Sequence, residues 1–184
     1  MKNAGFGLVD LLTTITISGV LIGSAVPSLF STYERSKSTG HISSVINTLK
    51  AARNYAITHN KDVFICGSNT QHSCSKTWNK FIIAFVDSDN NKTLSGDDKI
   101  IFLHQFTDSN SYFYSRIASG MQHTQFNTLG AAKYAGSFIY CPKNQNKRFA
   151  HRATWNRLGR SYRGRDKNGD GFIDDTSKNK INCY

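Results

Sequence analysis

The chain has 184 residues, which is enough for one folded domain with a substantial core but not for several. Its 23 Lys and Arg against 12 Asp and Glu give a formal net charge of +11. This excess favours an anionic partner, either nucleic acid or anionic lipid. The mean hydropathy is −0.42, so the chain is polar outside any local apolar segment.

The apolar segment is 6–30, FGLVDLLTTITISGVLIGSAVPSLF, whose 25 residues include one formal charge. At about 1.5 Å per residue, a helix of this length can cross the roughly 30 Å of bilayer hydrocarbon. The five-residue head before it, MKNAG, has a single positive charge. This head is too short for an ordinary secretory leader, and no small-x-small cleavage site follows the segment. We therefore expect a single-pass membrane helix over 6–30.

Asp10 is the charged residue inside this segment. A carboxylate in a membrane helix is costly unless it finds a partner, so Asp10 is a functional candidate. Cleavage between Gly5 and Phe6 would create an α-amino group one helical turn away. That group could pair with the carboxylate of its own chain or of a neighbour.

The N-terminal residues GFGLVDLL resemble the prepilin signature G-F-x-L-[IV]-E-L-L of type IV pilins and pseudopilins, with Asp10 where that family usually has Glu. The resemblance implies that a prepilin peptidase removes the leader 1–5, that Phe6 is methylated, and that the helix packs with other pilins. It also implies location in the inner membrane and the extracellular pilus, with the globular domain periplasmic or outside. The alternative is a plain signal anchor.

An amphipathic helix is predicted over 31–60, continuing the apolar segment. Its apolar residues recur at spacings of three and four, which is the period of a helix with one buried face. They are Ile42, Val45, Ile46, Leu49, Ala52 and Ala56. The outward face has the basic residues Lys37, Lys50 and Arg53.

From residue 61 onward the pattern changes to that of a β-rich globular domain, 61–184. Strands are predicted at 63–66, 81–86, 99–103, 112–114, 137–140 and 149–155. The turn-rich loop 87–98 joins the second and third of these, which predicts an antiparallel hairpin. A long helix followed by antiparallel strands is an α+β fold.

Four cysteines follow the apolar segment, at Cys66, Cys74, Cys141 and Cys183. An even number with no CxxC pair favours disulfides in an oxidising compartment over a zinc site. Three connectivities are possible, and we expect Cys66 to pair with Cys74 and Cys141 with Cys183.

The order of several downstream residues resembles the FimT/GspH family of minor pilins and minor pseudopilins. These residues are Tyr55-Ala56, Cys66, Cys74, Trp78, Ala84-Phe85-Val86-Asp87, Phe126-x-x-x-Gly130, Cys141 and Gly159-Arg160. The resemblance covers nearly the whole chain. It implies a type IV pilin-like α+β fold, in which the long N-terminal helix packs on an antiparallel β-sheet domain.

Two acidic loops are candidate metal sites. Asp166, Asn168, Asp170 and Asp174 match the first nine positions of an EF-hand loop, but Ser177 replaces the bidentate Glu at the twelfth. The loop 87–98 lacks the central glycine. Turns rich in Gly, Asn and Asp explain both segments without a metal, so no metal or other cofactor is expected.

Catalytic signatures are absent from the sequence: it has no serine elbow, P-loop, HExxH motif or paired-carboxylate motif, and its six histidines are scattered. The chain is therefore expected not to be an enzyme, and it offers no catalytic residue.

The C-terminal segment 143–184 is strongly basic, because its eleven Lys and Arg outnumber its four Asp to leave +7. Guanidinium groups match phosphate geometry, and interleaved aromatic side chains can stack on bases. In FimT-like pilins a Gly-Arg-x-Arg motif near the C-terminus is associated with DNA binding. Gly159-Arg160-Ser161-Tyr162-Arg163 resembles it, with the second arginine one place late. The candidate DNA-binding residues are Arg160, Arg163, Arg165, Arg157, Arg148, Arg152, Lys143 and Lys147.

These observations favour a minor type IV pilin that binds DNA non-specifically for uptake in natural transformation. The expected partners are DNA, other pilins, prepilin peptidase and the inner membrane. The alternatives are a minor pilin that primes pilus assembly and a GspH-like minor pseudopilin of type II secretion. A basic segment with no partner also remains open.

The first prediction concerns processing at the Gly5–Phe6 bond. The mature protein from its native host should lack MKNAG and have one added methyl group, because the glycine leaves room for the peptidase. Intact-mass measurement checks this result. Filaments whose subunits keep Met1 would contradict the pilin interpretation.

Overall fold

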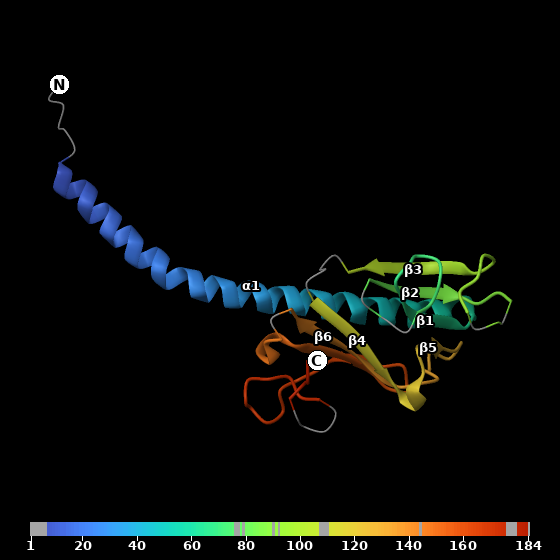
Figure 1. The fold of residues 1–184 in the computed structure, drawn as a ribbon. Helices are drawn as coiled ribbons and strands as arrows, with labels where there is room; N and C mark the ends of the chain where they lie inside the picture. Colours follow the sequence, from blue (N-terminus) through green and yellow to red (C-terminus); the bar gives the residue numbers. More distant parts are fainter. Residues whose placement is uncertain are drawn as a thin grey trace. The chain divides into compact units, whose positions relative to one another are not determined.

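The computed structural model describes residues 7–75, 78, 80–89, 91, 93–106, 111–143, 145–175 and 180–183. The chain divides into two compact units, Met1–Lys37 and Ser38–Tyr184, and each is described by itself. Figure 1 shows the elements in chain order. They are α1 (Leu8–His59), β1 (Val63–Ser68), β2 (Phe81–Val86), β3 (Lys99–Gln105), β4 (Ser111–Ile117), η1 (Ala118–Gly120), β5 (His123–Phe126), β6 (Gly136–Pro142), η2 (Lys147–Phe149), β7 (His151–Trp155) and β8 (Ser161–Arg163).

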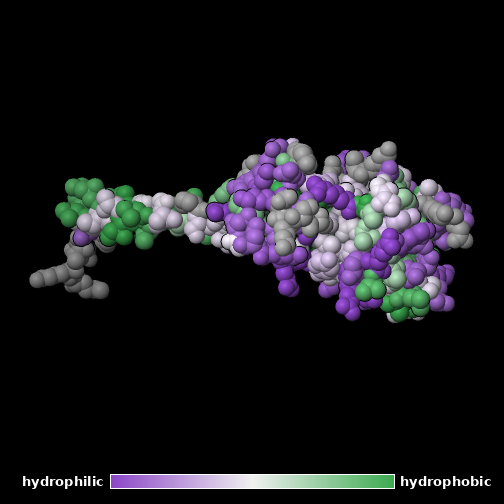
Figure 2. All heavy atoms as spheres, turned by 90° about the horizontal axis from the view of Figure 1, so that it is seen from below, coloured by the Kyte–Doolittle hydropathy of each residue, from purple (hydrophilic) through white to green (hydrophobic). Residues whose placement is uncertain are grey.

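The first unit holds the apolar part of α1, which is long and apolar enough to cross a membrane. Large apolar side chains such as Leu8 and Val20 are exposed all around it. Its hydroxyl groups bond within the helix: Thr14 Oγ1 donates to the Leu11 carbonyl at 2.8 Å, and Ser24 Oγ donates to the Leu21 carbonyl at 3.0 Å. Such internal bonds let polar residues lie in an apolar environment. Figure 2 shows the apolar character of this part against the hydrophilic surface of the domain.

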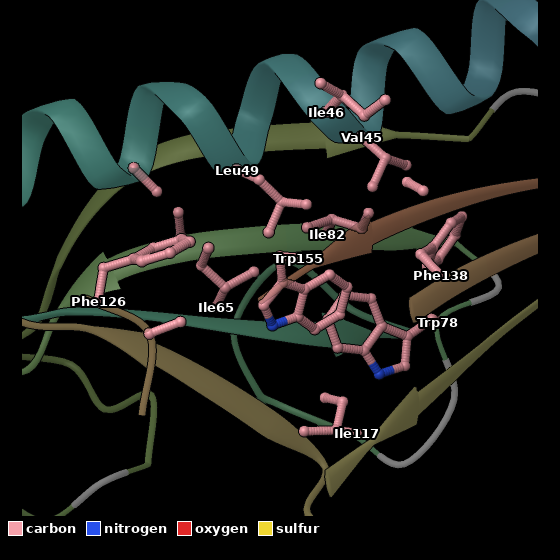
Figure 3. Packing of buried hydrophobic residues seen from close by; sticks show 14 of the residues in the cluster. Val45, Ile46, Leu49, Ile65, Trp78, Ile82, Ile117, Phe126, Phe138 and Trp155 are labelled. Carbon is pink, nitrogen blue, oxygen red and sulfur yellow. The ribbon is translucent and has the colours of Figure 1, made fainter. Parts of the chain in front are cut away.

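The second unit is organised around the rest of α1. The predicted stripe from Ile42 to Ala56 is confirmed, since all six of its apolar side chains are buried. They pack in one cluster with residues of both β-sheets. Figure 3 shows Val45, Ile46 and Leu49 pointing from α1 toward Ile65 and Ile82 of one sheet. The aromatic residues Phe138 and Trp155 of the other sheet complete this core.

The strands form two four-stranded antiparallel sheets, with orders β3-β2-β1-β5 and β4-β6-β7-β8. The predicted hairpin of β2 and β3 is confirmed, with Phe81 opposite Gln105. The α+β class with a long N-terminal helix on antiparallel strands is confirmed as well. Two strands lack a sequence signal, β5 and β8, because both are short and polar.

Each sheet also has an apolar outer face. Alternate residues of a strand point to opposite faces, so a strand buried throughout needs a cover on both sides. On the outer face of the first sheet, Phe64, Ile83 and Phe85 pack with Cys66. On the outer face of the second, Ile139 and Cys141 pack with Ile181 and Cys183 of the C-terminal tail. The domain therefore has one inner core and two smaller outer clusters.

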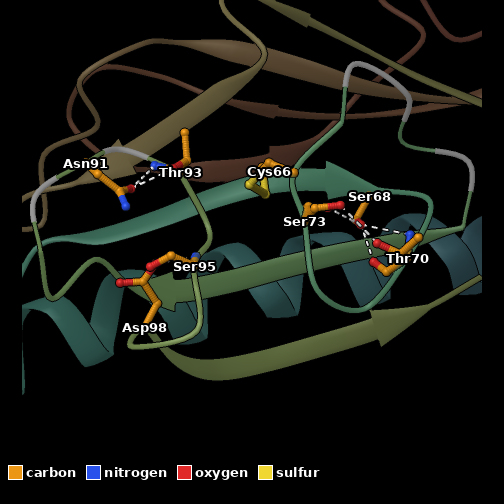
Figure 4. Close-up of a disulfide and its surroundings, with 9 residues drawn as sticks. Cys66, Ser68, Thr70, Ser73, Asn91, Thr93, Ser95 and Asp98 are labelled. Carbon is orange, nitrogen blue, oxygen red and sulfur yellow. Dashed lines mark hydrogen bonds between the residues drawn. A yellow bond between two sulfur atoms is a disulfide. The ribbon is translucent and has the colours of Figure 1, made fainter.

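A disulfide lies in each outer cluster. Cys66 pairs with Cys74 and Cys141 pairs with Cys183, which confirms both predicted pairings. Beside the first bridge, Ser68 Oγ accepts a hydrogen bond from the Thr70 amide at 3.0 Å, which orders the start of the loop between the two cysteines (Figure 4). The second bridge ties the tail to β6.

The second prediction compares the two bridges. Their partners are 8 and 42 residues apart in sequence. In the chain-entropy treatment, replacing both cysteines of each pair with alanine should lower the free energy of unfolding by about 2.5 and about 4 kcal/mol, respectively. The longer loop loses more because it constrains more of the unfolded chain. Thermal unfolding of the 38–184 domain followed by circular dichroism measures both, and a larger loss at Cys66–Cys74 would contradict the prediction.

Candidate functional site

The basic residues of the C-terminal segment lie at two ends of the second sheet. Strand β7 separates them, and its five residues span about 17 Å at 3.3 Å each. Lys143, Lys147 and Arg148 precede β7, whereas Arg157 and Arg160 follow it. All five are exposed. The candidate DNA-binding residues therefore form two groups, because a strand runs between them.

Arg152 requires a correction. It lies in β7 opposite Ile139, on the outer face of the sheet, and is only 5% exposed because the chain around Asp175 covers it. Its Nη1 lies 3.4 Å from Oδ1 of Asp175, and the same carboxylate lies 2.6 Å from Nη1 of Arg116. Arg152 thus stabilises the fold and does not belong to the candidate DNA-binding surface.

The arginines after β7 are held by the backbone of β8. Arg163 is paired with Ala153 across the sheet, and its Nη2 donates to Ser43 Oγ of α1 at 2.5 Å. This bond fixes β8 against the helix. Arg165 follows the strand and is exposed. Antiparallel pairing returns the chain toward the start of β7, so Arg165 lies toward the Lys143 end.

Two turns with the sequence Asn-x-Leu-Gly, 127–130 and 156–159, meet at the other end. In each, the glycine N–H donates to the asparagine carbonyl, at 2.8 and 2.9 Å, and the glycine has a positive φ of 74° and 76°. A Cβ atom on Gly159 would overlap the carbonyl oxygen of Gly130, so this contact requires glycine. Arg53 Nε donates to that same oxygen at 2.8 Å.

A groove of about 510 Å³ lies beside the second turn. It is lined by residues of α1 and of the chain entering β8, namely Lys50, Arg53, Asn54, Gly159, Arg160, Ser161 and Tyr162. Sequence reasoning placed Lys50 and Arg53 on the outward face of the helix but did not connect them to Arg160. More than one hundred residues separate the two segments, so no local pattern could reveal the contact.

The two acidic loops differ in how their carboxylates are arranged. In the loop 87–98, oxygens of Asp87, Asp89 and Asp98 lie within 4.8 Å of one another. No such group involves Asp166, Asp170 and Asp174 in the described part of the chain.

The stronger sequence match, at 166–174, is instead an ordered turn. Backbone N–H groups of Gly171 and Gly169 donate to the Asp166 carboxylate at 2.8 and 2.7 Å and lower its pKa. Asn168 Oδ1 accepts from the Asp170 amide at 3.2 Å, and Asp174 is buried, where its Oδ2 accepts from the Lys167 amide at 2.8 Å.

At the N-terminus, Asp10 Oδ2 accepts a hydrogen bond from the Gly7 amide at 3.3 Å. This places the carboxylate beside the residue that would follow a processed N-terminus. Gly5 and Phe6 lie outside the described residues, so processing stays a prediction.

The sequence profile of the family described as Type II transport protein GspH matches residues 41–159. The chain belongs to the GspH family. This confirms the FimT/GspH resemblance and accounts for the order of residues from Tyr55 to Gly159. No curated protein matches the chain at significant similarity.

Solved structures show the same fold as this GspH-family chain. The type IV minor pilin FimU of Pseudomonas aeruginosa strain PAO1 is 16% identical, with a TM-score of 0.57, over 82% of this chain and 98% of FimU. The minor pseudopilin EpsH of the Vibrio cholerae type 2 secretion system is 11% identical, with a TM-score of 0.53, over 69% of this chain and 95% of EpsH. The protein is thus a GspH-family member with the fold shared by a type IV minor pilin and a minor pseudopilin.

The third prediction separates structural from surface arginines. Arg152→Gln should lower the free energy of unfolding by about 2 kcal/mol, because it removes one charged partner of Asp175, which keeps its contact with Arg116. Arg160→Gln, at an exposed position, should change it by less than about 0.5 kcal/mol. Thermal unfolding of both variants measures the difference. Equal stabilities would mean that the Arg152–Asp175 pair contributes nothing.

Proposed function

We propose that this minor pilin binds DNA non-specifically through exposed arginines of its C-terminal segment, and that the filament brings the DNA to the cell in natural transformation. The observation that carries the proposal is a set of exposed cations without acidic partners. No carboxylate of the described residues pairs with Arg157, Arg160 or Arg165. Unmatched guanidinium groups on a chain of net charge +11 favour a phosphate backbone.

The mode of binding follows from the kind of contact. Arginines on exposed turns and strand ends reach phosphate oxygens, which position a protein on DNA without reading its sequence. Each phosphate contact releases condensed counterions, so affinity should fall steeply with salt. Non-specific binding of this kind has a dissociation constant on the order of micromolar or weaker at physiological salt.

A role in assembly is the second candidate, either priming of a type IV pilus or a place in a secretion pseudopilus. The family match and the similarity to EpsH favour it. In this case the basic residues would contact another pilin subunit, and DNA would bind weakly even at low salt.

The fourth prediction tests the DNA proposal with the full chain in a neutral detergent. Replacing Arg157 and Arg160 together with Gln should weaken binding to a labelled 20-base-pair duplex equally for different sequences. It should also flatten the log–log salt slope by up to about two units, if each arginine contacts one phosphate. Fluorescence anisotropy over a range of salt concentrations measures both effects.

The matched control removes two positive charges from other exposed positions, Lys99→Gln and Lys133→Gln, and should change the slope less. In the native host, the arginine variant should lower transformation while leaving pilus number unchanged. A parent protein that ignores DNA at low salt would reject the proposal and favour the assembly role.

A further inference from the structure

We propose that the groove between α1 and the turn before β8 is a phosphate-binding seat, in which Lys50 and Arg53 of the helix act together with Arg160. The assignment of its phosphate to DNA rests on the proposed function. The seat itself requires only a phosphate group, whether from a nucleic-acid backbone, a lipid headgroup or free phosphate.

The charges that line the groove are all of one sign. Lys50, Arg53 and Arg160 line a space of about 510 Å³, and no carboxylate is among the lining residues. In the described ranges, none of the three makes an ion pair. Cations gathered on concave walls create a strong positive potential there, which an entering anion relieves. A groove with this lining therefore favours an anion.

Ser161, one of the residues that line the groove, has a hydroxyl oxygen without a partner among the described residues. Ser161 Oγ is buried and makes no hydrogen bond within the part of the chain that the structure describes. A buried polar atom without a partner is costly, and a ligand oxygen in the groove would supply the missing bond. Tyr162 lies beside it at the rim and is half exposed. Cations and a hydroxyl donor together match the oxygens of a phosphate.

The groove is held rigidly on both sides. Arg53 Nε donates to the carbonyl of Gly130, and within the described residues its two terminal nitrogens make no hydrogen bond, so they can donate to a ligand. On the other wall, the Arg160 amide donates to Asn156 Oδ1 at 3.0 Å, which fixes the backbone from which the Arg160 side chain extends. The contact between the two Asn-x-Leu-Gly turns prevents either wall from sliding. Binding to such a prearranged site costs little ordering.

The two walls of the groove come from distant parts of the sequence, α1 and the C-terminal segment. A variant of α1 therefore tests the groove without changing the C-terminal arginines. If the C-terminal arginines bind DNA on their own, Lys50 on α1 should be irrelevant. If the groove seats one phosphate, Lys50 and Arg160 should act on the same contact. Their effects should then not add.

The fifth prediction uses the full chain in neutral detergent with Lys50→Gln, Arg160→Gln, the double variant and Lys99→Gln as the matched control. Glutamine has nearly the helix propensity of lysine, so α1 should be undisturbed. Each single groove variant should weaken duplex binding by about five-fold at 0.1 M salt and flatten the salt slope by about one unit. The double variant should flatten it by about one unit as well, not two. Thermal unfolding confirms that all variants are folded.

A second measurement identifies the source of the phosphate. Titration calorimetry adds inorganic phosphate, or dihexanoyl-phosphatidylglycerol as a soluble headgroup, to the parent and to Lys50→Gln. Binding of either probe that depends on Lys50, in a parent protein that ignores DNA, would support the seat and reject the proposed function. Binding of DNA that Lys50→Gln alters no more than Lys99→Gln does would reject the seat and leave the proposed function intact. No binding of any probe would reject both.

Discussion

Both sheets of the domain depend on one stripe of side chains on α1. The residues from Ile42 to Ala56 are buried against the inner faces of the two sheets, so a single helix face closes both halves of the core. Six strands, β1, β2 and β4 to β7, contribute buried residues to the same cluster, so a substitution in the stripe would weaken the packing of both sheets. The same helix continues as the apolar segment of the first unit. The element that a filament or a membrane would hold is therefore also the element on which the domain is built.

The stripe and the central strands were predictable because their patterns are strong and local. The spacing of Val45, Leu49 and Ala52 has the helical period, and β2 is a continuous apolar run bounded by turns. Strand β8 has no such signal, because its residues Ser161–Arg163 are polar and become a strand only by pairing with β7. The division of the strands into two sheets could not be predicted from the sequence either, because the apolar pattern of a strand does not show which strand it pairs with.

The site was predictable only in part, for a related reason. The run of charges along the chain identifies the arginines. Residues that are close in this run are not all close in the folded domain. Strand β7 separates Arg148 from Arg157, and the C-terminal chain around Asp175 covers Arg152 on the outer face of the sheet. The groove residues on α1 could not be joined to Arg160 from spacing, since the contact depends on how the two Asn-x-Leu-Gly turns meet. The Asn-x-Leu-Gly sequence occurs twice in the chain, but the sequence does not show that the two turns contact each other.

The two disulfides have a consequence for how the protein must be produced. Each bridge lies in the cluster that covers the outer face of one sheet, and the second also holds the tail that includes Ile181. In a reducing cytosol neither disulfide forms, so the segments over the outer faces are not held in place. The apolar outer residues of both sheets then become accessible for association between chains. Soluble recombinant protein therefore requires export or oxidative refolding, and material prepared with thiol reductants should be prone to aggregation before any function can be assayed.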